Sequence, residues 1–215
     1  MSRFKHIIDQ DPQQVQQQSV PYDWPKVFPK SIVGLDRDGV INIDKGTYIT
    51  DPDDWEPIPG SLEAIRLIRL KGYNLVILTN QGGIIKKEQT HAQVEAIHQR
   101  MMEVFGNAGI YSIDGLFYSE SSLKNDYYAK PNIGMFHRTE KELFNNKIRF
   151  KDKGFYVGDK MSDLKAAERI GATPVLVRTG YGAETEGELK KFSKEKLRKK
   201  TKVFNSLLQF AQKLP

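Results

Sequence analysis

The stretch SIVGLDRDGVIN, residues 31–42, joins an apolar run to a polar turn. The apolar run IVGL is typical of a strand that is covered on both faces of a parallel sheet. Asp36 and Asp38 follow where that strand should end. Ligands of open parallel sheets bind beyond the carboxyl ends of the strands, so these two carboxylates are the first candidates for a functional site.

Similar apolar runs recur along the chain and alternate with helical patterns. The further predicted strands are NLVILT (74–79), DGLFYS (114–119), GFYVGD (154–159) and TPVLVR (173–178). The predicted helices span residues 61–71, 90–106, 134–145 and 162–170. This alternation predicts an α/β fold, a doubly wound, Rossmann-like parallel sheet with right-handed crossovers. We expect residues 202–214 to add a short strand and an amphipathic helix.

Composition narrows the class of protein. The chain has 215 residues, 39% hydrophobic and 28% charged, which suits one domain with an extension. We predict a polar arm over residues 1–30 and one domain over residues 31–215. With no cysteine, disulfides, thiolate metal sites and cysteine nucleophiles are excluded. No apolar run approaches the roughly 20 residues of a membrane span, and the N-terminus lacks a signal pattern, so we expect a cytoplasmic protein without a membrane partner.

The net charge of +6 is concentrated in one segment near the C-terminus. Residues 190–202, the basic segment, hold eight Lys or Arg and one Glu, and the remainder of the chain is nearly neutral. Such a segment is most often a solvated helix face. It is also typical of a surface for RNA, DNA or lipid headgroups, and the sequence leaves both interpretations open.

Polar residues at the other strand ends extend the candidate site. Carboxylates from two strand ends, Asp36 and Asp159, can converge on a hard cation such as Mg²⁺. Asp38, in the loop just beyond the strand, suits an acid/base role. Thr79 and Lys130 would supply a hydroxyl and a cation to the oxygens of a phosphoryl group.

Four segments together resemble a known family. DRDGVIN (36–42), TNQ (79–81), AKPNIGM (129–135) and VGDKMSD (157–163) are similar to the four motifs of the haloacid dehalogenase superfamily of phosphatases. GTYITDPDDWEPIPGS (46–61) and TNQGGI (79–84) resemble the branch that contains the heptose bisphosphate and histidinol-phosphate phosphatases. The resemblance covers residues 31–182.

The resemblance implies a Mg²⁺-dependent phosphatase that works through an aspartyl-phosphate. Asp36 would be the nucleophile, and Asp38 would protonate the leaving alkoxide and then activate water. Asp36, Asp159 and the backbone carbonyl of Asp38 would bind Mg²⁺. Asp163 would support the metal site indirectly or through water. The groups implied to hold the phosphoryl group are Thr79, Asn80 and Lys130.

The substrate end departs from the family pattern. The segment SESSLKNDYY (119–128) contains neither Cys nor His where many relatives carry a zinc loop, so we expect no structural zinc. Ala129 stands where the pattern has a substrate-binding arginine. Lys86, in the loop after TNQ, is a candidate to supply the missing charge. The resemblance therefore supports the reaction chemistry of the family for this chain more strongly than it supports any substrate of the family.

Spacing predicts an open site without a large cap domain. About 40 residues separate Asp38 from Thr79 and about 50 separate Thr79 from Lys130, and predicted helices and strands already occupy both intervals. Substrate selection would then depend on the loops over residues 43–57, 82–89 and 119–129.

Three functions remain open. The first is a phosphomonoesterase, expected to be a monomer, that acts on a small phosphorylated metabolite such as heptose 1,7-bisphosphate or another sugar phosphate or bisphosphate. The second is a nucleic-acid 3′-end phosphatase, since polynucleotide 3′-phosphatase domains have similar motifs and residues 190–202 could follow a phosphate backbone. The third is a binding or regulatory protein that is catalytically weak, because a fold alone does not establish activity.

Overall fold

The computed structural model describes residues 31–191 and 195–215. The predicted arm over residues 1–30 and part of the basic segment, residues 192–194, lie outside the described residues. Within the part that is described, no helix is long and apolar enough to cross a bilayer.

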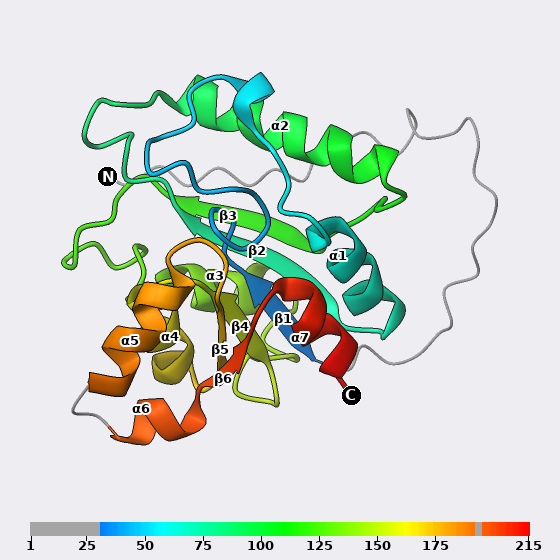
Figure 1. The fold of residues 1–215 in the computed structure, drawn as a ribbon, viewed down its shortest axis with the longest axis vertical. Helices are drawn as coiled ribbons and strands as arrows, with labels where there is room; N and C mark the ends of the chain where they lie inside the picture. The colour runs from blue at the N-terminus through cyan, green and yellow to red at the C-terminus, as the bar shows by residue number, and fades with distance from the viewer. Residues whose placement is uncertain (1–30, 192–194) are drawn as a thin grey trace.

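Six strands form one parallel sheet (Figure 1). In chain order they are β1 (Ile32–Leu35), β2 (Asn74–Asn80), β3 (Gly115–Ser119), β4 (Phe155–Gly158), β5 (Thr173–Val177) and β6 (Lys202–Phe204). Their order across the sheet is β3-β2-β1-β4-β5-β6, and every pairing is parallel. The predicted doubly wound sheet is therefore confirmed, with strand ends that differ from prediction by at most one residue.

The helices confirm most of the predicted pattern. They are α1 (Ser61–Leu70), α2 (His91–Asn107), α3 (Gly134–Glu142), α4 (Met161–Ile170), α5 (Gly182–Lys191), α6 (Glu195–Lys200) and α7 (Leu207–Lys213), with a 3-10 turn η1 (Pro52–Asp54). A capping box of Thr90 and Gln93 starts α2. Helix α3 ends earlier than predicted, because the chain turns at Asn145 and Asn146, both at positive φ. Helices α5 and α6 do not correspond to any helix predicted from the sequence.

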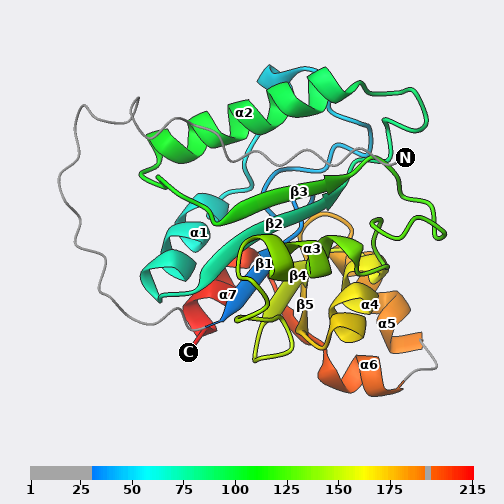
Figure 2. The ribbon, with the colours of Figure 1, turned by 180° about the vertical axis from the view of Figure 1, so that it is seen from behind.

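Helices cover both faces of the sheet (Figures 1 and 2). Val33 and Leu35 of β1 pack in the core beneath α1, α2 and α7, whereas Ile32 packs in a second core beneath α3 and α4. Burial on both faces explains why β1 reads as a continuous apolar run rather than an alternating one. Among the described residues, the segments between the strands contain no large cap.

The order of the strands places a crevice at the middle of the sheet. The chain runs outward from β1 to β3 and then returns to β4, beside β1, before it continues to β6. Connections leave β1 and β4 in opposite directions at this point, so their carboxyl ends flank an open crevice. Asp36 follows β1 and Asp159 follows β4, which brings both predicted residues to that crevice.

Helix α6, which holds most of the described part of the basic segment, lies at the amino end of strand β6. Helix α6 leads into the amino end of β6, which runs parallel to β5. The crevice lies at the carboxyl ends of the strands. The lysines of α6 therefore do not line the route to Asp36.

Candidate active site

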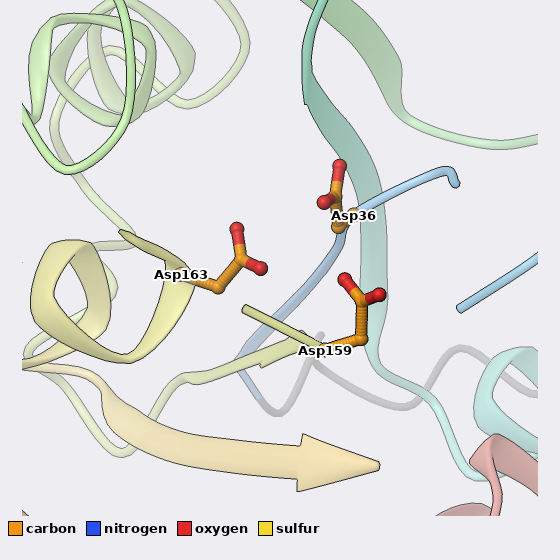
Figure 3. A group of neighbouring side chains, drawn as sticks. All are labelled: Asp36, Asp159 and Asp163. Atoms are coloured by element: carbon orange, nitrogen blue, oxygen red, sulfur yellow. The ribbon is translucent and has the colours of Figure 1, made fainter. Parts of the chain in front are cut away.

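Three buried carboxylates meet at the crevice: Asp36, Asp159 and Asp163 (Figure 3). They come from the end of β1, the end of β4 and the first turn of α4. Each offers an oxygen atom within 4.8 Å of the others. The structure thus brings together the two strand-end carboxylates predicted for a metal, and it places Asp163 directly beside them.

Local backbone structure holds Asp163 in the cluster. Its carboxylate accepts a hydrogen bond of 3.0 Å from the backbone N–H of Lys160, which satisfies a free amide at the start of α4. Gly158 leaves room for this approach, because a Cβ there would lie 2.2 Å from the Cβ of Asp163. The sequence VGDKMSD therefore fixes both carboxylates that follow β4.

Lys130 joins two of the carboxylates. Its buried Nζ lies 2.8 Å from Asp36 Oδ1 and 2.7 Å from Asp163 Oδ1. Burial by itself lowers the pKa of Lys130, but the charges of Asp163 and Asp36 outweigh it and the pKa is raised. Lys130 therefore stays charged beside the predicted nucleophile.

Asp159 sits in a close-fitting backbone cradle. A Cβ at Gly39 or at Gly180 would lie 2.2 or 2.3 Å from its Oδ2, and the Tyr181 N–H donates to that oxygen at 2.9 Å. Its Oδ1 is buried without a hydrogen-bond partner among the described residues. Burial, followed by repulsion from Asp163 and Asp36, raises the pKa of Asp159 to about 8.

The cluster fits a hard divalent cation. Burial raises the pKa of Asp36 as well, despite the opposing charge of Lys130, and the Asp163 charge adds to the rise. The Lys130 ammonium contacts only two of the three buried carboxylates, and Asp159 Oδ1 has no hydrogen-bond partner among the described residues. The cluster can therefore accept further positive charge, and all-oxygen sites of this kind suit Mg²⁺. Asp36, Asp159 and Asp163 each offer an oxygen that could hold such an ion.

Asp38 is surrounded by hydrogen-bond donors. Its carboxylate accepts from Asn42 Nδ2 at 2.9 Å, from Gln81 Nε2 at 3.1 Å, and from the guanidinium of Arg37 at 3.0 Å. Burial acts to raise the pKa of Asp38, but the Arg37 charge and these hydrogen bonds outweigh it and lower the pKa. Asp38 is thus held apart from the acidic cluster in an ionised form.

The two polar residues after β2 have different surroundings. Thr79 is buried, and its Oγ1 accepts a hydrogen bond of 2.9 Å from Gln81 Nε2, which also contacts Asp38. The Asn80 side chain contacts the loop that carries Lys130. Both polar atoms of its side chain pair with the backbone of Lys130, at 2.9 and 3.0 Å. In this structure Asn80 fixes the loop that carries Lys130.

A cleft of about 370 Å³ adjoins Asp38. Its walls come from two of the three predicted loops, 43–57 and 82–89, and include Tyr48, Lys86 and Gln89. Lys86 is exposed, and its Nζ lies 5.4 Å from the centre of the Tyr48 ring. The third loop, 119–129, does not line this cleft, but Glu120 accepts a backbone hydrogen bond of 3.2 Å from Ile85 and so supports the wall.

An ion pair ties the wall of the cleft to the acidic cluster. Lys160, next to Asp159, lies 3.0 Å from Asp44 Oδ2 and 4.7 Å from the centre of the Tyr181 ring. Burial lowers the pKa of Lys160, but the nearby Asp159, Asp36 and Asp44 charges outweigh it and raise the pKa. The loop over residues 43–57 is thereby anchored at its first turn.

Sequence reasoning missed four residues of this site, namely Arg37, Gln81, His98 and Tyr156. Arg37 and Gln81 lie inside the quoted motifs, so their position was a usable signal. His98 and Tyr156 lie within a predicted helix and strand, where packing is the default interpretation. Ala129 is fully buried, so no exposed side chain stands where the family pattern has arginine.

Comparisons with known proteins agree with this geometry. The family model described as polynucleotide kinase 3 phosphatase matches residues 31–212. The D-glycero-beta-D-manno-heptose-1,7-bisphosphate 7-phosphatase of Neisseria meningitidis is 32% identical over 182 residues, which are 84% of this chain and 92% of that protein.

Two solved structures are similar as well. The D,D-heptose 1,7-bisphosphate phosphatase of B. bronchiseptica, complexed with magnesium and phosphate, has a TM-score of 0.73 and 29% identity, over 85% of this chain and 96% of that one. The enzyme of the same name from Burkholderia thailandensis has a TM-score of 0.61 and 31% identity, over 85% and 97% of the two chains. The buried acidic cluster lies at the crevice where the connections of β1 and β4 leave in opposite directions. Together with this geometry, the matches show that the chain belongs to the haloacid dehalogenase superfamily of phosphatases, as a phosphoric monoester hydrolase related to the heptose bisphosphate phosphatases.

Proposed function

We propose that this chain is a Mg²⁺-dependent phosphomonoesterase that forms an aspartyl-phosphate on Asp36 and acts on a small phosphorylated metabolite. One observation carries the proposal. Asp36 and Asp163 both contact the ammonium group of Lys130, and Asp36 lies beside Asp159 at the crevice in the middle of the sheet. A carboxylate nucleophile needs a cation to offset repulsion from an incoming phosphate, and this arrangement supplies one.

The described residues suit the two steps of such a reaction. In the first, an oxygen of Asp36 bonds to phosphorus while the ester P–O bond breaks. Asp38, which would take up a proton from solvent once the negative charge of the phosphate is bound beside it, gives that proton to the leaving alkoxide. In the second, Asp38 takes a proton from water, which attacks the phosphoaspartate and releases phosphate. Asp36, Asp159 and the backbone carbonyl of Asp38 would hold Mg²⁺, which would supply positive charge to the phosphoryl oxygens. Lys130 would hold the phosphoryl group throughout, with Thr79 nearby.

The cleft favours a small substrate with a polar, anionic remainder. Its volume of about 370 Å³ is at the small end of the range for metabolite pockets. Lys86 and Tyr48 at its wall offer a cation and an aromatic face beyond the reacting phosphate. Heptose 1,7-bisphosphate, which the similar proteins are named for, is the first substrate to test, followed by other sugar phosphates and bisphosphates.

A second candidate is a nucleic-acid 3′-end phosphatase, which the description of the matching family model favours. The position of α6 argues against it, because α6 lies at the amino end of β6 whereas the crevice lies at the carboxyl ends of the strands. A basic surface that guided a polynucleotide would be expected to approach the reacting phosphate. We therefore place it second.

Phosphate release across a substrate panel tests the proposal. The panel holds heptose bisphosphate, histidinol phosphate, sugar and nucleotide monophosphates and a 3′-phosphorylated oligonucleotide, each with Mg²⁺ and with EDTA. We expect one sugar phosphate or bisphosphate to dominate, with release lost in EDTA and in Asp36→Asn. Strong release from the oligonucleotide would favour the second candidate. If folded protein that binds Mg²⁺ releases no phosphate from any substrate of the panel, a binding or regulatory role is favoured.

Three smaller expectations accompany this proposal: a monomer, a cytoplasmic location and no structural zinc. Size-exclusion chromatography with light scattering measures the first. Cell fractionation measures the second. Elemental analysis of protein purified without chelator measures the third, and a stoichiometric zinc content would contradict it.

A further inference from the structure

Arg37 stands between the two catalytic candidates and is almost completely buried, with 1% of its surface exposed. The side-chain contacts of Arg37 are with Asp38, Gln81 and His98 rather than with the acidic cluster. A buried guanidinium is costly unless its donors are paired. The partners of Arg37 therefore show what the buried charge is used for.

The guanidinium grips the carboxylate of Asp38. Nε and Nη2 lie 3.1 Å from Asp38 Oδ1, and Nη2 lies 3.0 Å from Asp38 Oδ2. Gln81 extends this contact, since its Oε1 accepts from Arg37 Nη2 at 3.0 Å and its Nε2 donates to Asp38 at 3.1 Å. The orientation of the Asp38 carboxylate thus depends on the plane of the Arg37 guanidinium.

His98 binds the remaining nitrogen of that guanidinium. It lies on α2 with no exposed surface, and its Nε2 is 2.9 Å from Arg37 Nη1. Arginine can only donate, so His98 Nε2 must accept and the imidazole proton resides on Nδ1. Burial, and then the Arg37 charge, holds the pKa of His98 well below its usual value, which keeps the ring neutral.

We propose that His98 is a positioning residue that acts through Arg37 to hold the acid/base carboxylate of Asp38 in place. This inference rests on the proposed function, in which Asp38 protonates the leaving group. Without an acceptor at position 98, Arg37 Nη1 becomes a buried, unpaired donor. The free-energy cost of that unpaired donor favours rotation of the guanidinium toward water, and this rotation would remove the contact that orients the Asp38 carboxylate.

The dependence of kcat/KM on the leaving group distinguishes a positioning role of His98 from a purely structural role. An alkyl phosphate releases a strongly basic alkoxide and needs the proton from Asp38, whereas p-nitrophenyl phosphate releases a stable anion that needs none. The ratio kcat/KM reports only the steps up to release of the leaving group, so water activation by Asp38 does not enter it. Misplacement of Asp38 should therefore lower kcat/KM for the alkyl phosphate alone.

The experiment compares His98→Leu, which removes the acceptor, with His98→Gln, which restores one. With the best alkyl phosphate of the substrate panel we expect His98→Leu to lower kcat/KM about 10- to 100-fold. With p-nitrophenyl phosphate we expect a loss of less than about threefold. His98→Gln should recover most of the alkyl activity. Met101→Leu, a buried neighbour on the same helix, should leave both substrates unchanged.

Two further variants keep the outcomes distinct. Arg37→Lys keeps the charge but not the two-atom contact, so it should show the same selective loss even if His98→Leu fails to fold. Asp38→Asn should show that loss at full size. Equal losses on both substrates in His98→Leu, or no recovery in His98→Gln, would overturn the role of His98. An unselective Asp38→Asn, or a wild type without phosphatase activity, would instead overturn the proposed function.

Discussion

Tyr156 places its hydroxyl 2.9 Å from Lys130 Nζ, and the same hydroxyl donates to the Leu78 carbonyl oxygen at 2.5 Å. Asp36, Asp163 and Tyr156 together match the three N–H donors of the ammonium group. Lys130 is therefore fixed by a strand residue as well as by two carboxylates. Tyr156 belongs to β4, which connects the position of Lys130 to the sheet itself.

Tyr156→Phe should weaken the reaction more than the fold. The ring stays packed on Phe136, at 4.8 Å between centroids, so only the hydroxyl is lost. We expect kcat/KM to fall about tenfold and stability to fall by about 1 kcal/mol, the usual contribution of one hydrogen bond. Steady-state kinetics and urea unfolding measure the two effects. Tyr118→Phe is the matched control, because its hydroxyl contacts His91 at 3.2 Å; equal activity losses in both variants would contradict the role of Tyr156.

Stability of the metal-free protein should fall as pH rises through the neutral range. Burial, and then Asp163 and Asp36, raises the pKa of Asp159 to about 8 in the folded state, against roughly 3.9 in the unfolded chain. Between these values the folded state binds the extra proton, so raising the pH from about 4 to about 8 lowers the free energy of unfolding, and above that range the loss levels off.

Thermal unfolding in EDTA, compared with Asp159→Asn, isolates this effect because other titrating groups contribute to both proteins. The melting temperature of the wild type should decline relative to the variant as the pH approaches about 8. Mg²⁺ should restore the wild type and leave the variant unchanged. A constant difference between the two proteins across this range would contradict the assignment.

Gly39 should be needed for metal binding because it has no side chain, and not only because its φ is positive. It has φ +80°, and a Cβ there would lie 2.2 Å from Asp159 Oδ2. Gly109 has φ +75° with nothing within 4 Å, so Gly109→Ala carries the backbone strain alone, about 1 kcal/mol. We expect Gly39→Ala to lose more stability than this and also Mg²⁺ affinity, measured by calorimetry. Retained affinity in Gly39→Ala would show that the cradle tolerates a side chain.

The Asp44–Lys160 pair should matter for substrate binding. Asp44→Asn removes the charge that ties the cleft wall to Lys160 at 3.0 Å, so the loop over residues 43–57 should loosen. We expect KM to rise about three- to tenfold with a smaller change in kcat, as for an interaction that acts on ground state and transition state alike. Glu56→Gln breaks a more exposed pair with Lys45 and should change little. Similar KM values for the two variants would argue against an anchoring role.

Much of the fold is readable in the sequence because its signals are local. The apolar run IVGL before Asp36 needs burial on both faces, and only a sheet between two helical layers provides it. The capping box at Thr90 and the alternation of strand and helix act over a few residues as well. The predicted strands agree with the structure to within one residue at their ends for this reason.

The set of candidate residues is also readable, but the contacts among them are not. Asp36, Lys130 and Asp159 lie in segments far apart in the chain, and their positions after predicted strands, together with motif order, suggested that they meet. Asn80 shows the limit, since the sequence suggested a phosphoryl contact but did not predict that its side chain pairs with the Lys130 backbone. This pairing joins residues 50 positions apart in the chain, so only the tertiary structure shows it.

The sequence by itself determined the parallel sheet, the lack of a large cap and the strand-end carboxylates, because hydrophobic periodicity and segment length are properties of the chain. The tertiary structure alone decided that Asp163 shares Lys130 with Asp36, that Tyr156 anchors Lys130, and that His98 reaches Arg37 from α2. Each of these contacts joins side chains whose local sequence fits ordinary packing or capping. Their roles arise because burial in a medium of low polarity forces every charge and hydrogen-bonding atom to find a partner.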